Sequence, residues 1–416
     1  SSGEGEDAGS LGGAEGTDSS EPTAGPGTSG AVTTVASGPT GETTSATQNP
    51  TTLTTTDPST SGPSTESTTS DTDASSTTDE PSSTTEDPPD TTGTTADWSH
   101  ARDITFTAQD LDESLSDFPV PIRLDDDRID YAAVQGGGED LRFVDLSSGD
   151  VLAHEIELWN PSGESIVWVL FPSIPTDDDV VIQMRYGNED AEDAQDPPGV
   201  WINEYVFVHH LAGNCDDGFD DSSGNGHDAT CEGADDTTLV DGFLGQGVEF
   251  VNGGDLRIAD HPDFDLGTAL TFELIARVTS DTLATNSERQ ALSKGNQFRL
   301  LPERGGGGGG LRVIVWADGG TQRRANSGPL AEGWHQLAGS SSDEQIRLFL
   351  GGSMVDSRGA AGALDLVDDP VVIGASMVGV LDEVRLSAVA RSESWVQAQA
   401  AAAEDDVLTF GPEYAL

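Results

Sequence analysis

Oxygen-bearing side chains at alternating positions mark one segment of the sequence as a candidate cation site. The segment Asp221-x-Ser223-x-Asn225-Gly226-x5-Glu232 nearly matches the spacing of an EF-hand calcium loop. The glycine-containing run at 213–218 before it cannot form the entering helix, so a true EF-hand is not expected. Calcium takes about six to eight oxygen ligands, and the candidates here are Asp220, Asp221, Asn225 and Asp228. The alternative is a turn whose polar side chains bond their own backbone.

Two glutamates on one predicted strand form a second candidate site. Glu155 and Glu157 are separated by one residue, so their side chains share a face and lie roughly 6.5–7 Å apart from the strand rise alone. Paired carboxylates at such a distance can catalyse glycoside hydrolysis. Glycosidases that use acids alternating on a strand carry a third acid soon after, whereas Leu158-Trp159-Asn160 follows here. We therefore expect a solvated strand face, with catalysis as the alternative.

The two cysteines, Cys215 and Cys231, are expected to form a disulfide if the chain is extracellular. Two alternatives stay open at this stage. The thiols could be buried and free, or they could bind zinc together with His209, His210 or His227. The spacing of these residues fits no common zinc pattern.

Aromatic and basic residues further along could contact a sugar. The indole rings of Trp316 and Trp334 could stack on pyranose faces, and Arg323, Arg324 or His335 could bond hydroxyl groups. A tryptophan in a strand more often packs in a core, and that alternative is kept. The sequence contains no nucleophile elbow, phosphate loop or metalloprotease motif.

Short alternating segments predict the elements that must position these residues. Six strands are expected between 102 and 188, and polar or proline-rich segments separate them. Two prolines, Pro119 and Pro121, place one of these strands at a sheet edge. The spacing is typical of a β-sandwich. The polar segment at 189–199 is interpreted as a linker to a second domain.

The second domain is also predicted to be all-β. Strand patterns recur from 206 to 386 with glycine-rich turns between them, which is typical of a jelly roll. One helix is expected, with Ser392 as its cap and its end near Glu404. A last strand is expected at 407–410. The predicted organisation is a stalk at 1–97, a β-sandwich at 98–190 and a jelly roll at 200–416 that includes the helix and last strand.

Charge separates the stalk from the rest and limits the possible partners. Residues 1–97 contain 17 of the 75 acidic residues and none of the 18 basic ones, and they are rich in Thr, Ser, Gly and Pro. Such a segment has too little apolar surface to fold, so an extended, disordered stalk is expected. The other 58 acidic residues give the remainder a net charge of about −40, which excludes nucleic acid as a partner. Cations and neutral polysaccharides are favoured instead.

The stalk predicts a location at a cell surface. No run of apolar residues is long enough to span a membrane, and no signal peptide is visible. A lipid-modified cysteine just before Ser1, as in bacterial surface lipoproteins, is a hypothesis for the means of attachment.

Motifs in a fixed order make residues 200–390 resemble the LamG-like, concanavalin A-type jelly roll. They are Val208-His209-His210-Leu211, Asp220 to Gly226, Gly245 to Phe250, Leu270 to Ala276, Glu332 to Ala338 and Gly379 to Leu386. Ile275 stands where the family more often has tryptophan. The resemblance implies a binding or adhesion module, often for glycans, with a structural calcium, and it adds Asp382 to the candidate calcium ligands.

Residues 98–188 resemble an uncharacterised bacterial domain often found before such jelly rolls. The matching pieces are Trp98, Asp140 to Phe143, Glu155 to Trp159, Val167 to Val169 and Tyr186 to Asn188. Together the features predict a secreted or surface-attached protein that binds an extracellular polysaccharide or glycoprotein without cleaving it, stabilised by calcium. The alternatives are a glycan hydrolase or lyase, and a structural component of a surface layer or filament, which edge-to-edge strand pairing would distinguish.

Overall fold

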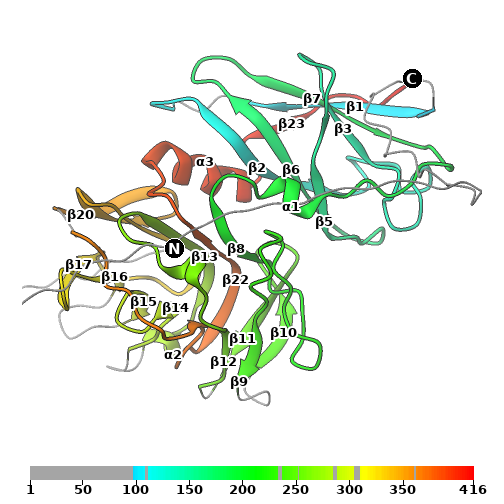
Figure 1. The fold of residues 1–416 in the computed structure, drawn as a ribbon. Coiled ribbons are helices and arrows are strands. Elements are labelled where there is room, and N and C mark those ends of the chain that lie inside the picture. The colour runs from blue at the N-terminus through cyan, green and yellow to red at the C-terminus, as the bar shows by residue number, and fades with distance from the viewer. Residues whose placement is uncertain are drawn as a thin grey trace, which may run out of the picture. The chain divides into compact units, whose positions relative to one another are not determined.

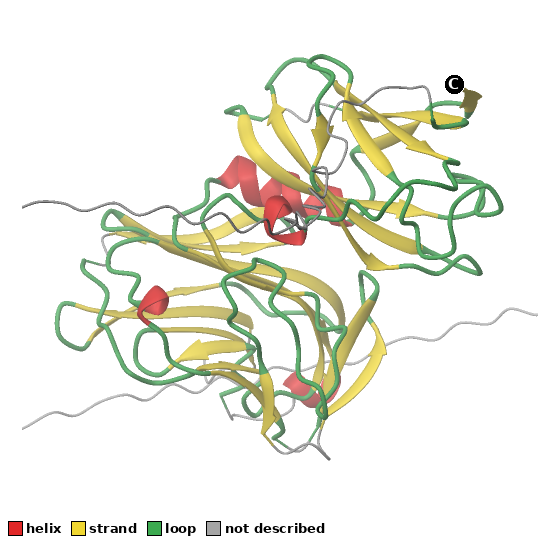
Figure 2. Ribbon diagram, turned by 45° about the vertical axis from the view of Figure 1, so that its right-hand side comes forward, coloured by secondary structure: helices red, strands yellow, loops and turns green. Residues whose placement is uncertain are grey.

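The computed structural model describes residues 97–107, 111–232, 237–251, 253–283, 288–303, 310–359 and 362–416. The predicted stalk therefore lies outside the described residues, apart from Asp97. The described chain is mostly β, as the sequence predicts (Figures 1 and 2). Within this part of the chain, no helix combines the length and the apolar character needed to cross a bilayer.

The first sandwich consists of a six-stranded sheet and a three-stranded sheet, both antiparallel. The larger sheet has the order β23-β1-β7-β3-β4, and β24 also pairs with β1. Its strands are β1 (His100–Phe106), β3 (Arg142–Asp145), β4 (Val151–Leu152), β7 (Val180–Tyr186), β23 (Leu408–Phe410) and β24 (Tyr414–Ala415). The smaller sheet has the order β2-β6-β5, with β2 (Leu115–Leu124), β5 (His154–Leu158) and β6 (Ser165–Ile174). The two prolines of β2 thus lie in an edge strand, as predicted.

The jelly roll stacks an eight-stranded sheet on a seven-stranded one. The first has the order β10-β11-β22-β13-β18-β19-β20, with β8 also paired to β22. Its strands are β8 (Tyr205–His209), β10 (Thr237–Asp241), β11 (Gln246–Phe250), β13 (Leu270–Val278), β18 (Gly333–Ser341), β19 (Gln345–Leu350), β20 (Ser353–Gly359) and β22 (Gly379–Ser387). The second has the order β17-β16-β15-β14-β21-β12-β9. Its strands are β9 (Thr230–Glu232), β12 (Asp255–Ile258), β14 (Leu292–Lys294), β15 (Phe298–Glu303), β16 (Gly310–Ala317), β17 (Thr321–Asn326) and β21 (Val371–Ile373).

The helices in the described part of the chain are few and short. They are α1 (Pro197–Val200), α2 (Ser280–Leu283), α3 (Glu393–Ala403) and the 3₁₀ turn η2 (Pro262–Phe264). As predicted, the Ser392 hydroxyl caps α3 by accepting a hydrogen bond from the Trp395 amide. The helix lies between the two sandwiches in both views (Figures 1 and 2). Its Trp395 ring packs edge-on against Phe118 of the first sandwich at 4.8 Å.

The two sandwiches share buried apolar surface. One core fills the jelly roll, and a second fills the first sandwich and extends over α3 to the outer face of the eight-stranded sheet. Strand β13 shows why: Leu274 points into the jelly-roll core, whereas the next residue, Ile275, packs in the other core. Because both faces of this strand are buried, three apolar residues, Leu274, Ile275 and Ala276, follow one another in its sequence.

The strand predicted at 407–410 forms as β23 but belongs to the first sandwich rather than the jelly roll, and the short β24 follows it. Residues 408–410 pair with β1, so that Ile104 lies opposite Phe410. The predicted linker is likewise held against the first sandwich, because the Gln195 side chain accepts a hydrogen bond from the amide of Ile156 at 2.7 Å. The chain therefore passes from the first sandwich to the jelly roll and back again.

Candidate functional site

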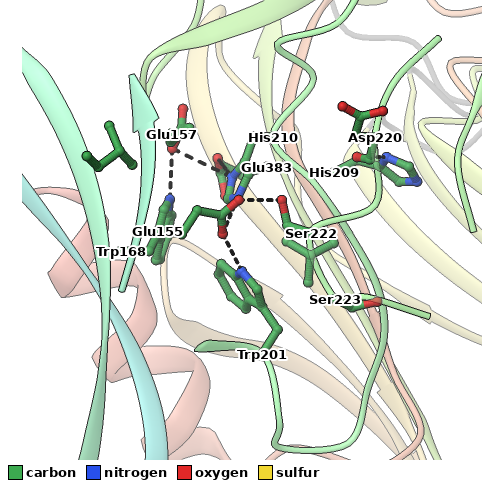
Figure 3. A network of polar contacts seen from close by, with 12 residues as sticks. Glu155, Glu157, Trp168, Trp201, His209, His210, Asp220, Ser222, Ser223 and Glu383 are labelled. Atoms are coloured by element: carbon green, nitrogen blue, oxygen red, sulfur yellow. Dashed lines mark hydrogen bonds and ion pairs between the residues drawn. The ribbon is translucent and has the colours of Figure 1, made fainter. Parts of the chain in front are cut away.

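The best candidate site lies where β5 of the first sandwich faces the end of β8 and the middle of β22. Four ionisable side chains converge there, and we refer to them as the acid–histidine cluster: Glu155, Glu157, His210 and Glu383 (Figure 3). Glu155 and Glu157 come from β5, His210 follows β8 directly, and Glu383 comes from β22. Chain segments distant in sequence thus meet at one point.

A β-bulge sets the direction of the Glu383 side chain. Arg385 pairs with Glu273 and Asp382 pairs with Ile275, so two residues of β22 lie opposite one residue of β13. Glu383 occupies this bulge with a φ of 53°, a left-handed conformation that costs a non-glycine residue on the order of 1–3 kcal/mol. Such strain persists only where surrounding contacts fix it, and here the carboxylate is bonded on both sides.

Glu155 is an ionised carboxylate held by three donors. The Trp201 indole donates to it at 2.7 Å, the Ser222 hydroxyl at 2.6 Å and Nε2 of His210 at 3.3 Å. Burial acts to raise the pKa of Glu155, but the charge of His210 and these hydrogen bonds lower it overall.

His210 carries the positive charge that balances the acids. Its Nδ1 atom lies 2.7 Å from Oε1 of Glu383, and its Nε2 atom faces Glu155, so both ring nitrogens face carboxylate oxygens. Burial acts to lower the pKa of His210, but Glu383, Glu155 and Glu157 together raise it well above its usual range. The ring also stacks on Trp168, with centroids 5.7 Å apart. A doubly protonated imidazolium is therefore the form that this geometry accepts.

The pKa of Glu157 is shifted in the opposite direction to that of Glu155. Its Oε2 atom accepts a hydrogen bond from the Trp168 indole at 2.8 Å, whereas Oε1 is buried without a partner among the described residues. Burial, followed by the charge of Glu383, raises the pKa of Glu157 to about 8. By contrast, His210 and Arg385 lower the pKa of Glu383 to about 2, although burial acts to raise it. The cluster thus holds one protonated and two ionised acids at neutral pH.

A pocket of about 350 Å³ opens over this cluster, and we call it the junction pocket. Glu155, Glu157 and His210 line it on one side, and Asp220 and Ser222 line it on the other. Its volume lies near the lower end of the range for small-ligand sites. Apolar side chains complete the wall: Ile156, Pro197, Pro198, Leu211 and Phe219. The pocket can therefore present both hydrogen-bonding groups and an apolar surface to a ligand.

The prediction of a solvated strand face for Glu155 and Glu157 is wrong. Their side chains are only 9% and 1% exposed, because the jelly roll covers this part of β5. The sequence pattern assigned the pair to one domain and gave no indication that another domain would pack on the same face.

The predicted calcium loop folds as a tightly bonded turn. The carboxylate of Asp221 accepts hydrogen bonds from the amides of Val208, Ser223 and His227 and from the Ser223 hydroxyl. The side-chain nitrogen of Asn225 donates to two backbone carbonyls, and the side chain of Asp228 accepts a hydrogen bond from the backbone amide of Asp221. Asp220 is exposed at the rim of the junction pocket. These contacts support the turn interpretation, and calcium binding stays a prediction.

Asp382, the ligand implied by the family resemblance, lies on the other side of the cluster. Its Oδ2 atom accepts hydrogen bonds from the amides of Phe243 and Leu244, and its Oδ1 atom is buried without a partner among the described residues. Burial and the charges of Glu383 and Glu157 raise its pKa well above the usual range. Three groups of metal-ligating side chains converge in the described part of the chain, and none contains Asp382 or a residue of the predicted loop set.

Cys215 and Cys231 form a disulfide across a separation of 16 residues. The bond ties the loop after β8 to β9, on the side of the jelly roll that carries Asp220. The zinc alternative through these cysteines and the free-thiol alternative are therefore wrong.

The predicted sugar-binding residues are spread over two sheets. Trp316 and Arg323 lie on β16 and β17 of the seven-stranded sheet, whereas Trp334 and His335 lie on β18 of the eight-stranded sheet. Trp316 is only 6% exposed and has the Arg299 guanidinium over its ring at 4.9 Å. The Trp334 ring packs against Phe243. The four residues do not form a common aromatic platform.

Sequence reasoning named His210 only as an alternative zinc ligand, and it missed Glu383 and the two tryptophans that hold the acids. His210 and Glu383 appear in the sequence as parts of jelly-roll motifs. They were therefore interpreted as structural residues of the family and not as partners of the two acids. A usable signal was the charge of Asp382-Glu383-Val384-Arg385 inside a strand that is otherwise apolar. Buried charges of this kind need partners, and apart from the Glu383–Arg385 pair these lie far from β22 in the sequence, at His210, Phe243 and Leu244.

Comparisons with known proteins match two segments of the chain. Residues 251–397 match the model of the concanavalin A-like lectin/glucanases superfamily. Residues 137–231 match the model of a domain of unknown function (DUF2341). The chain thus contains a concanavalin A-like jelly roll preceded by that domain, and the acid–histidine cluster draws residues from both matched segments. None of the curated proteins compared with the sequence matches it.

Solved structures show weak overall similarity. The binding domain of Paraclostridial Mosquitocidal Protein 1 is 13% identical, with 47% of this chain and 51% of that chain covered and a TM-score of 0.39. The ligand binding domain of botulinum neurotoxin serotype D, solved with N-acetylneuraminic acid, is 9% identical over 49% and 52%, with a TM-score of 0.38. The match thus spans about half the length of these toxin domains. Domain 4 of the extracellular arabinanase AbnA from Geobacillus stearothermophilus, solved with arabinotriose, is 17% identical over 47% and 98%, with a TM-score of 0.38. TM-scores this low do not establish a function for this chain.

Proposed function

We propose that this protein is a non-catalytic binding protein of the cell surface or extracellular space, with an extracellular glycan or glycoprotein as its ligand. The match of residues 251–397 to a superfamily of lectins and glucanases supports the carbohydrate class. The charge of about −40 beyond residue 97 disfavours phosphate-rich or strongly anionic ligands. A neutral polysaccharide satisfies both conditions.

The junction pocket is the proposed ligand site, and it is the observation that carries the proposal. Its polar rim offers the exposed carboxylate of Asp220 and the hydroxyl of Ser222, which suit the hydroxyl groups of a sugar. Its apolar wall, which includes Pro198 and Phe219, suits the C–H face of a pyranose ring. A volume of about 350 Å³ accommodates a short glycan segment rather than a long chain in a groove.

The geometry favours binding over cleavage. Each oxygen of Glu155 already accepts a hydrogen bond from the protein, so neither is free to attack a sugar or to activate water. Glu383 is likewise bonded to His210 and Arg385. These contacts hold the two carboxylates in place, so a ligand would bind through the side chains at the rim of the pocket.

One observation supports a glycan hydrolase as the second candidate. Two acids that line the pocket have pKa values displaced in opposite directions, since that of Glu157 is raised to about 8 and that of Glu155 is lowered. A protonated acid beside an ionised one is the arrangement that glycoside hydrolysis requires. For this activity, Glu155 would have to give up at least one of its present donors.

The test uses the full chain on a glycan array, with a variant that fills the pocket. Ala212 lines the pocket and is exposed, so Ala212→Trp should block a ligand without disturbing the core. Ala132→Trp, at an exposed alanine outside the pocket, is the matched control. We expect a glycan that is retained by the wild type and the control but not by Ala212→Trp. Equal retention by all three proteins would remove the pocket from the proposal.

The same retained glycan distinguishes the two candidates. It is incubated with the full chain and analysed for new reducing ends by mass spectrometry. Intact glycan supports the binding proposal. New reducing ends that disappear in Glu157→Gln would instead make the protein a hydrolase.

A further inference from the structure

Three metal-ligating side chains converge at a second place, on the jelly roll outside the junction pocket. Nε2 of His227 lies 3.0 Å from Oδ2 of Asp263, and Nδ1 of His261 lies 3.2 Å from the same oxygen. His227 comes from the segment between β8 and β9, whereas His261 and Asp263 are at the start of η2. Each residue offers one ligand atom, and these atoms all lie within 4.8 Å of one another.

Local hydrogen bonds hold His227 in place. Its backbone amide donates to Oδ2 of Asp221 at 3.0 Å, and its carbonyl oxygen lies 3.1 Å from Nε2 of His209. Its ring packs against Phe264 at 4.7 Å, and only 5% of its side chain is exposed. The imidazole is thus positioned before any ion arrives, which lowers the entropic cost of binding.

His261 and Asp263 present a lone pair and a negative charge to each other. As the residue that caps η2, His261 accepts a hydrogen bond from the Asp263 amide through Nδ1, so this nitrogen carries no proton. Its lone pair therefore lies 3.2 Å from a carboxylate oxygen without a proton between them. A cation shared by the two atoms would replace this repulsion with two favourable bonds, and the single lone pair of Nδ1 would then turn from the Asp263 amide to the ion.

The donor set and its spacing point to a particular class of metal. Two imidazole nitrogens and one carboxylate oxygen suit zinc and similar transition metals, whereas calcium and magnesium prefer oxygen ligands alone. Bonds of about 2.0–2.1 Å in tetrahedral geometry place ligand atoms about 3.3 Å apart. The separations of 3.0 and 3.2 Å are close to this value.

We propose that His227, His261 and Asp263 bind one divalent transition metal ion of the zinc class, with a fourth coordination position open to solvent. The side chains of His261 and Asp263 are about half exposed, so an ion and a water molecule can reach the site. The bound ion joins the segment between β8 and β9 to the turn that precedes β13. This segment also carries Asp220 and Ser222, so metal binding would stiffen one wall of the junction pocket.

The test measures thermal unfolding of the full chain after treatment with a chelator, with zinc, calcium or magnesium then added. Zinc alone should raise the midpoint, because it binds only the folded state. Cobalt, used as a spectroscopic substitute, should give the visible absorption of a tetrahedral site. His261→Asn removes the imidazole but keeps a good capping residue, so this variant should still fold. Its affinity for zinc should fall by at least about 100-fold, because even the loss of an outer-shell partner costs 10–100-fold.

His335→Ala is the matched control, since His335 lies outside the cluster. This variant should respond to zinc as the wild type does. An unchanged wild-type midpoint with zinc would overturn the proposal. The same conclusion would follow if zinc raised the midpoints of His261→Asn and Asp263→Asn as much as that of the wild type.

Discussion

Replacing Glu157 by glutamine should stabilise the protein increasingly as the pH rises. Folding raises the pKa of this carboxyl from 4.5 to about 8, because burial and Glu383 oppose its charge. Between these values the folded state keeps a proton that the unfolded state has released, so the free energy of unfolding falls as pH rises. Each pH unit costs about 1.4 kcal/mol, which amounts to about 3 kcal/mol at neutral pH and about 5 kcal/mol above pH 8.

Glutamine is close in shape and cannot ionise, so it removes this cost. Its carbonyl oxygen can still accept the hydrogen bond from the Trp168 indole. The raised pKa of His210 also makes stability fall as pH rises above its unfolded value, and Glu383 and Glu155, the two acids that raise this pKa most, are present in both proteins. The difference between variant and wild type therefore reports mainly the proton on Glu157.

The assay is denaturant unfolding of the full chain at intervals from about pH 5 to about pH 9. The control is Glu249→Gln, at an exposed glutamate on β11, and its difference from the wild type should stay small at every pH. For Glu157→Gln, the difference should grow across the range and level off near pH 8. If it is constant with pH, Glu157 is not a buried acid that is protonated at neutral pH, and the electrostatic account of the cluster fails.

Three further predictions follow from other parts of the structure. Replacing both Cys215 and Cys231 by serine should lower the free energy of unfolding by about 3 kcal/mol, because the disulfide closes a loop across 16 residues; denaturant unfolding with and without reductant checks this. Ser392→Ala should cost about 1 kcal/mol, since it removes the capping bond to the Trp395 amide, and Ser392→Asn should restore most of that stability in the same assay. If the Asp220–Asp228 loop binds calcium, the ion should raise the thermal midpoint relative to chelator in the wild type but not in Asp220→Ala; a turn that binds no calcium gives the same midpoint in both conditions.

The sequence predicted a strand or helix well where the residues of that element alone determine its structure. The alternation around Ile104 and the capping residue Ser392 gave β1 and α3 to within a few residues. Short strands such as β9 and β14 were missed, because three residues carry too little pattern to distinguish a strand from a turn. The pairing of Leu408–Phe410 with β1 was also missed, because it depends on contacts between opposite ends of the described chain.

The candidate site was predictable only in part, for a related reason. The spacing of Glu155 and Glu157 correctly placed two acids on one face of a strand. Their environment depends on His210 and Glu383, and no local pattern connects those residues to β5. The turn at Asp221 was easier to predict, because the residues that donate to its carboxylate, such as Ser223 and His227, are close in sequence.

The placement of charge between the sandwiches implies that the junction pocket needs both of them. Removing charges from water costs several kcal/mol per ion, and hydrophobic residues could hold two domains together at lower cost. Here Glu155 of the first sandwich is compensated by His210 of the jelly roll, so the first sandwich carries a charge that the other sandwich balances. Glu383 is compensated within the jelly roll by His210 and Arg385. A fragment that ends before residue 200 would lose β23 and β24 from the sheet of β1 and would leave Glu155 without His210 and Ser222. A fragment that begins at residue 200 would expose Ile275 and Phe349 and would leave the imidazolium of His210 without Glu155. The pocket is therefore a property of the joined sandwiches, and its ligand should be sought with the full chain rather than with either domain alone.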